Sequence, residues 1–107
     1  MKASDGSWLR VEGLDLHSDL RISFELAIFG TTATIATREG EAHVRIPPGT
    51  SSGKKMRLKG KGQHERGNYG DHYVVVQIDV PRGDDSQTDL KRQLAELVAR
   101  LHKLESA

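Results

Sequence analysis

The sequence predicts a mainly β protein: a two-layer β-sandwich with a short helix, followed by a C-terminal α-helix. Between residues 18 and 80, apolar and polar residues alternate in several segments, which is the period of half-buried strands. Near the C-terminus the period changes to that of a helix face. There the apolar positions are Leu90, Leu94, Leu97, Leu101 and Leu104. At 107 residues the chain has the size of one domain.

The first segments predict strands. Residues 1–14 are mostly polar, and residues 8–11 form a candidate short edge strand. In residues 18–24, Leu20, Ile22 and Phe24 alternate with polar residues, which predicts a half-buried strand.

A helical turn and a hairpin are expected next. Residues 25–29 are good helix formers and precede Gly30, which favours one helical turn with a glycine cap. Residues 31–37 are rich in β-branched side chains and predict a strand. A tight turn at residues 38–41 then leads into a strand over residues 42–46.

The most specific part of the sequence is residues 45–62. Pro47 and Pro48 cannot donate to a β-ladder, so the preceding strand must leave its sheet there. Met56 and Leu58 then alternate with basic residues and predict another strand. Its basic side comprises Lys54, Lys55, Arg57, Lys59 and Lys61.

Charge is concentrated in this region of the chain. Residues 45–66 hold seven Lys or Arg against one Glu, a local +6, whereas the remainder carries −5 (9 minus 14). Such a patch could bind an acidic tail or nucleic acid, or it could simply be a solvated strand face.

The C-terminal half is expected to contain a loop, a long strand and a helix. Residues 60–70 carry four glycines and predict a mobile surface loop. Residues 71–80 predict a central strand, because apolar side chains occupy both of its faces. A helix is predicted over residues 87–104, behind a candidate capping box at Ser86 and Asp89. Residues 84–85 would form a hinge, so the leucine stripe could pack on the sandwich or pair with a second chain.

Catalytic and metal-binding motifs are lacking in the sequence. Without cysteine there is no thiolate or disulfide, which fits a reducing compartment and a cytoplasmic location. Residues 49–54 have three residues between glycines, not the four of a phosphate-binding loop. The histidines lack metal-helix spacing, and His43 and His72 are expected on strand surfaces. No membrane-spanning stretch or Gly-x-Ser-x-Gly elbow occurs. We therefore expect a binding protein that uses no metal or cofactor.

A second candidate binding surface is an apolar strand edge. An extended peptide could add beside residues 18–24 or 31–37 if either strand lies at a sheet margin. The side chains it would meet are Leu20, Ile22 and Ile35. The alternative is that all three are ordinary core residues.

Several motifs in order resemble the C-terminal substrate-binding region of DnaJ-type (J-domain) co-chaperones. They are DLRISFELAIFG (residues 19–30), VRIPPGT (44–50), RLKGKG (57–62) and GDHYVVV (70–76), and the resemblance covers residues 15–82. It implies a β-sandwich with a short helix and an apolar groove for unfolded clients. It also implies delivery to a DnaK-type ATPase and dimerisation through the end of the chain.

The sequence departs from the family pattern in three ways. It has no His-Pro-Asp tripeptide of a J-domain, no cysteine-rich zinc module, and one sandwich where relatives usually carry two. It is expected to be an excised fragment or a shortened relative that does not by itself stimulate ATP hydrolysis. The groove would rest on Leu20 and Ile35, with Thr34 and Thr37 making its wall more polar.

Three functions follow from these features. The first is a non-enzymatic chaperone module, with a peptide-binding sandwich over residues 15–83 and a dimerisation helix over residues 84–107. The second is a recognition module whose basic strand binds an acidic tail or nucleic acid. The third is a purely structural dimerisation unit.

Overall fold

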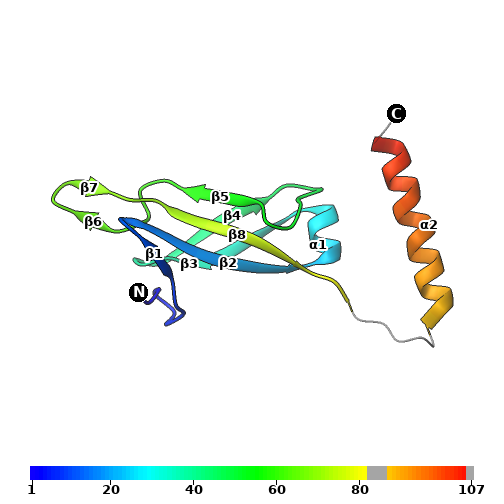
Figure 1. Ribbon diagram of the computed structural model, residues 1–107, viewed down its shortest axis with the longest axis horizontal. Coiled ribbons are helices and arrows are strands. Elements are labelled where there is room, and N and C mark those ends of the chain that lie inside the picture. Colours follow the sequence, from blue (N-terminus) through cyan, green and yellow to red (C-terminus); the bar gives the residue numbers. More distant parts are fainter. Residues whose placement is uncertain (82–86, 106–107) are drawn as a thin grey trace.

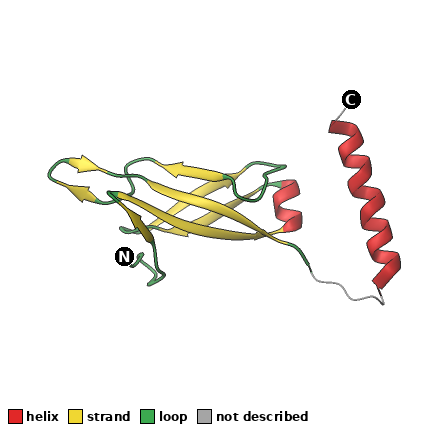
Figure 2. Cartoon of the chain, viewed as in Figure 1, coloured by secondary structure: helices red, strands yellow, loops and turns green. Residues whose placement is uncertain are grey.

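The computed structural model describes residues 1–81 and 87–105, with side chains described as far as residue 103. Its elements are β1 (Arg10–Glu12), β2 (Asp15–Ser23), α1 (Phe24–Phe29), β3 (Thr31–Ala36), β4 (Glu41–Ile46), β5 (Lys55–Leu58), β6 (His64–Glu65), β7 (Asn68–Tyr69), β8 (His72–Asp79) and α2 (Thr88–Glu105). The predicted fold class is confirmed: the chain is mainly β and carries a C-terminal helix (Figure 2).

The strands form two layers. The larger sheet has the order β1-β2-β8-β5, in which β2 and β8 are parallel and the other neighbours are antiparallel. The second layer is the antiparallel β3–β4 hairpin, which lies behind the larger sheet in Figure 1. Because β8 has β2 on one side and β5 on the other, the prediction of a central strand is confirmed.

The core lies between these layers, where the inward side chains of alternating strands meet. Its buried members are Ile22, Ala27, Ile35, Val44, Ile46, Val74 and Val76, with Leu20, Met56, Leu58 and Ile78 partly buried around them. A smaller cluster of Ala3, Leu9 and Leu16 attaches the N-terminal segment, with Ala36 against it. β2 therefore contributes side chains to both clusters.

The helical turn α1 closes one end of the sandwich as predicted. The Gly30 amide donates to the Leu26 carbonyl at 2.8 Å, which ends the helix. A Cβ at Gly30 would lie 2.9 Å from the Ile46 carbonyl oxygen, so glycine permits this close approach. The alternation prediction was wrong at Phe24, which begins α1 instead of ending β2. Short-range alternation cannot separate a strand end from a helix start.

The glycine-rich segment at residues 60–70 is not the irregular loop that was predicted, because it contains the β6–β7 hairpin. Its base is held by three backbone bonds: Gly62 to Gly70 at 3.0 Å, Gly70 to Gln63 at 2.8 Å, and Gln63 to Leu14 at 2.7 Å. A Cβ at Gly70 would lie 1.9 Å from the Leu14 carbonyl oxygen. Glycine is therefore needed at this position, because any side chain would prevent the close contact between the two backbone segments.

Several strand boundaries differ from prediction by one to three residues, among them those of the first and the last strand. The first strand begins at Arg10, because Trp8 forms an isolated bridge with Lys2 and stays 74% exposed. The last strand ends at Asp79, which leaves Val80 exposed. The predicted hinge at residues 84–85 and the capping residue Ser86 lie outside the described residues.

Helix α2 confirms the predicted C-terminal helix and stands beyond the α1 end of the sandwich in Figure 1. Its leucine stripe is largely exposed: Leu90, Leu94, Leu97 and Leu101 are all between 46% and 62% accessible. Val98 is the half-buried residue of this helix. The stripe therefore lacks an apolar cover among the described residues.

His72 corrects the prediction of a surface histidine, because it is fully buried in β8. Its Nε2 lies 2.7 Å from the Ser18 hydroxyl, while Nδ1 has no hydrogen-bond partner among the described residues. Burial lowers the pKa of His72, and the nearby charge of His17 lowers it further. The fold therefore favours the neutral imidazole.

Stability should consequently fall as the pH drops below about 6.5, the ordinary pKa of histidine. Below this pH the unfolded chain binds a proton at His72, whereas the folded chain does not. The free energy of unfolding therefore decreases further until the pH falls below the lowered pKa of His72 in the folded state. Thermal unfolding followed between pH 7.5 and pH 5 measures this loss of stability. His72→Leu should show a shallower pH dependence than the parent, whereas the exposed His43→Gln should keep the parent slope; equal slopes for His72→Leu and the parent would contradict this assignment.

Candidate functional site

The outer edge of β2 is open over most of its length. β1 pairs only with Asp15 to His17, whereas β8 pairs with the opposite edge as far as Ser23. The Leu16 amide donates to the Asp71 carbonyl at 2.9 Å, on the β8 side. Because backbone groups of successive strand residues point to alternate edges, the odd-numbered residues of β2 face away from β8.

Three residues thus present backbone groups at this edge: Asp19, Arg21 and Ser23. No strand of the described chain pairs with them. Asp19 and Arg21 each offer one N–H donor and one C=O acceptor there, and Ser23, the N-cap of α1, offers its N–H; together these groups form a template for another extended chain.

A cleft of about 170 Å³ lies beside this open edge, between β2 and β3. It is lined by Asp5, Ser7, Ser18, Asp19, Leu20, Thr34, Ile35 and Ala36. The structure thus brings Leu20 and Ile35 to one surface feature. Since a cavity of roughly 150 Å³ holds a benzene molecule, the cleft has room for one side chain. Ile35 is at the same time a buried member of the core, and Ile22, the third candidate, belongs to that core without lining the cleft.

Two of the residues that line the cleft are acidic. Asp5 accepts hydrogen bonds from the Ser7 hydroxyl at 2.6 Å and the Ser7 amide at 2.9 Å, and these lower its pKa. Asp19 accepts two bonds of 3.1 Å from the Arg10 guanidinium, which lower its pKa as well. Both groups are therefore ionised at neutral pH.

Sequence reasoning missed Asp5 and Ser7, because it treated residues 1–14 as a polar lead. The Ser4 amide donates to the Thr37 carbonyl at 2.8 Å, which brings this N-terminal turn to the end of β3. A backbone bond over such a sequence distance leaves no local signal. The buried residues that anchor the segment, Ala3 and Leu9, stand in no periodic pattern in the sequence.

The basic strand β5 forms the other edge of the larger sheet. Lys54, Lys55, Arg57, Lys59 and Lys61 are all exposed. Arg57 is already engaged, because its Nε donates to the Asp71 carboxylate at 2.7 Å. The Lys55 ammonium lies 5.5 Å from the centre of the Tyr73 ring, within the range of a cation–π contact. The predicted basic surface therefore exists, with one of its charges paired.

A third feature is an apolar groove of about 620 Å³ at the α1 end of the sandwich. Phe24 and Ile28 of α1 line it, together with Val80. On the facing side it is lined by Val98 and Leu101 of α2. Of the predicted dimerisation residues, Leu104 has a side chain outside the described ones.

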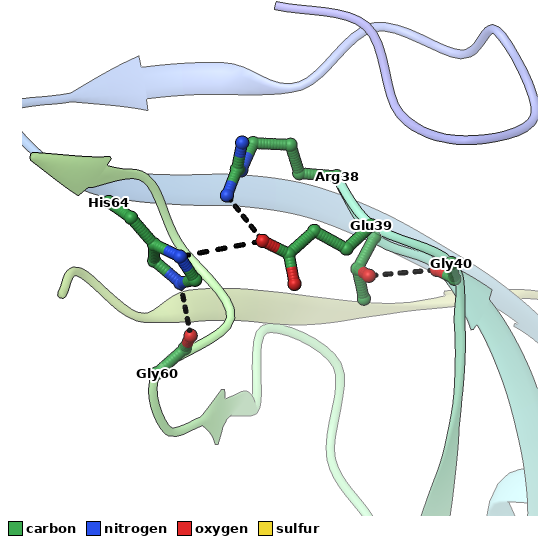
Figure 3. A network of polar contacts seen from close by, with 6 residues as sticks. Arg38, Glu39, Gly40, Gly60 and His64 are labelled. Atoms are coloured by element: carbon green, nitrogen blue, oxygen red, sulfur yellow. Dashed lines mark hydrogen bonds and ion pairs between the residues drawn. The ribbon is translucent and has the colours of Figure 1, made fainter.

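A polar network fastens the β3–β4 turn to the β6–β7 hairpin (Figure 3). The Glu39 carboxylate lies 2.5 Å from the Arg38 guanidinium and 3.4 Å from Nδ1 of His64. The other ring nitrogen of His64 lies 3.1 Å from the Gly60 carbonyl oxygen. This network lies at the end of the sandwich opposite α1, and none of its residues lines the cleft.

Two other kinds of site do not occur in the described part of the chain. There, His, Asp and Glu side chains nowhere gather in groups of three or more that could hold a metal ion. Among the same residues, neither helix has the length and apolarity needed to cross a bilayer. The candidate surfaces are therefore the open edge, the basic strand and the apolar groove.

Among known proteins, residues 2–81 match the family described as DnaJ C terminal domain. "Chaperone protein DnaJ" of Clostridium acetobutylicum is 40% identical over 88 residues, 79% of this chain and 24% of that protein. The protein of the same name from Halobacterium salinarum is 43% identical over 89 residues, 79% and 22% respectively. "Curved DNA-binding protein" of Coxiella burnetii is 37% identical over 91 residues, 84% and 29%. The chain thus spans about a quarter of the length of these relatives.

The open edge makes a direct prediction for hydrogen exchange. The amides of Asp19, Arg21 and Ser23 should exchange at least about tenfold faster than those of Leu20 and Ile22, because only the latter are bonded within the sheet. Residue-resolved exchange measured by NMR at pH 7 checks this. Uniform protection along β2 would show that something covers its outer edge.

Proposed function

Because the chain belongs to the DnaJ C-terminal domain family, we propose that it is a non-enzymatic chaperone module that binds exposed segments of unfolded polypeptides along the outer edge of β2. The observation that carries this proposal is the unpaired edge of β2 beside the cleft of Leu20 and Ile35. An extended client segment would add to the sheet as a further strand.

Backbone pairing suits a protein that must accept many sequences. The N–H and C=O groups of Asp19 and Arg21, together with the N–H of Ser23, would bond to the client main chain, which every sequence possesses. Client side chains would then alternate between the cleft and the outer face of the sheet. Ile22, buried in the core, would support the site by holding β2 in place and would not touch the client.

The remaining partners are proposed from the family. Since the chain spans only about a quarter of its relatives, its clients would reach a DnaK-type ATPase through a J-domain that these residues do not contain. A cytoplasmic location fits the lack of cysteine.

We also propose a homodimer through the leucine stripe of α2. Four of its leucines are about half exposed, which is unusual for a stable helix in water. The apolar groove next to α2 offers a complementary surface on the sandwich. Burying the stripe against a second copy would remove both apolar surfaces from water.

The basic strand supports a second candidate function, which is binding of an acidic tail or nucleic acid. The observation that favours it is the row of exposed lysines on a free sheet edge. A relative from Coxiella burnetii carries the name "Curved DNA-binding protein". Lysines at these positions would act as point charges on phosphates or carboxylates.

Client binding predicts that Leu20→Asp abolishes suppression of aggregation of a chemically unfolded model protein, measured by light scattering. A carboxylate beside the client would be removed from water without a partner, which costs more than the contact it replaces. Circular dichroism must show that the variant keeps its β content, and Phe29→Asp, at an exposed apolar residue of α1 outside the cleft lining, is the matched control. Full suppression by folded Leu20→Asp would argue against this site.

Charge-based binding predicts a different response. Replacing Lys55, Lys59 and Lys61 by Gln should weaken binding to duplex DNA or a poly-Glu peptide at least about tenfold at 50 mM salt, because each lysine displaces a counterion. Apolar client binding should not change. Affinity for DNA that is insensitive to salt between 50 and 300 mM would count against a role for these charges.

Dimerisation predicts that Leu97→Lys lowers the mass seen in sedimentation equilibrium from two chains to one, because the charge cannot be buried in an apolar contact. The control is Lys91→Gln, an exposed α2 residue outside the leucine stripe. A parent protein that sediments as a monomer at 100 μM would exclude the dimer.

A further inference from the structure

The cleft beside β2 has an unusual lining for a site that is expected to receive apolar side chains. The polar residues that line it all carry oxygen as their side-chain polar atom: Asp5, Ser7, Ser18, Asp19 and Thr34. No Lys, Arg, His, Asn or Gln of the described residues lines it. Leu20, Ile35 and Ala36 supply the apolar part of the wall. The cleft thus combines an aliphatic wall with a rim of hydrogen-bond acceptors.

The hydroxyl groups of this rim already have partners. Ser7 donates to the Asp5 carboxylate at 2.6 Å, and the Ser18 hydroxyl lies 2.7 Å from Nε2 of buried His72. The Thr34 hydroxyl lies 3.1 Å from Nδ1 of His43. A ligand would therefore find acceptor oxygens here more readily than donors.

The rim also keeps a net negative charge. Both carboxylates are ionised at neutral pH, because hydrogen bonds from Ser7 and Arg10 hold their pKa values below the usual range. Arg10 compensates Asp19, to which it donates two bonds. Asp5 has no cationic partner among the described residues, since both of its hydrogen bonds come from Ser7.

We infer that this cleft accepts the side chain of a lysine or arginine from the bound client, with the aliphatic stem along Leu20 and Ile35 and the cationic head at Asp5. A basic side chain has this same division into apolar stem and donor-rich head. A purely apolar side chain would shield the rim oxygens from water without giving them a donor. The inference rests on the proposed client binding and adds a preference for basic residues within extended apolar segments.

The test compares dye-labelled peptides that differ at one central position. The background is an uncharged Val/Ser heptapeptide, and the central residue is Lys, norleucine or Glu. Norleucine keeps the lysine stem without its ammonium group, so the pair isolates the charge. Fluorescence anisotropy with the full chain at 50 mM salt should give the order Lys, norleucine, Glu, with Lys about two- to fivefold tighter than norleucine, the size of one exposed ion pair.

Asp5→Asn is the diagnostic variant, because the amide oxygen can still accept from Ser7 and keep the turn. It should bring the Lys and norleucine affinities together while leaving norleucine binding unchanged. Glu25→Gln, an exposed carboxylate on α1 outside the cleft lining, should keep the full preference. The preference should also shrink at 500 mM salt, because the charges are screened.

The outcomes distinguish this inference from the proposed client binding on which it rests. If norleucine binds as tightly as Lys, or if Asp5→Asn keeps the preference, the basic specificity is wrong although client binding stands. If none of the peptides binds at millimolar concentration, client binding at this edge and the inference fail together.

Discussion

The parallel pairing of β2 with β8 is the interaction on which the rest of the structure depends. It runs from Leu16 opposite His72 to Ser23 opposite Asp79 and joins two segments far apart in the chain. A strand has two edges, and this pairing occupies one edge of each. β8 uses its second edge for β5, whereas the second edge of β2 is covered only at its start by β1. The open edge is thus a consequence of the sheet order.

The local elements could be predicted from sequence because their signals are local. Alternation identified β2 and β8, β-branched residues identified β3, Gly30 marked the end of α1, and leucine spacing identified α2. Leu20 and Ile35 line one cleft, and Ile35 is also a buried core residue, so their role in client binding stays a prediction. The burial of His72 was not anticipated, although His72 has the parity of Val74 and Val76 and therefore lies on their buried face; its polarity was given more weight than its position in the strand. Asp5 was not anticipated either, because it reaches the cleft through the backbone bond from its neighbour Ser4 to Thr37, near β3.

The three candidate surfaces lie on different elements, so they can act together. The open edge belongs to β2, the basic row to β5 at the opposite margin of the same sheet, and the leucine stripe to α2. A dimer would present two open edges, and two linked weak sites bind one unfolded chain with higher affinity than either site alone. Dimerisation through α2 would therefore strengthen client binding without altering the site itself.

Hydrogen exchange of the protein in the presence of a saturating client peptide tests the central claim most directly. If the client adds to the sheet at β2, the amides of Asp19, Arg21 and Ser23 should become protected, since they gain strand partners. The amides of Lys55 and Arg57 on β5 should exchange as before. Protection of the β5 amides with no change along β2 would contradict the account and move the client to the opposite edge of the sheet.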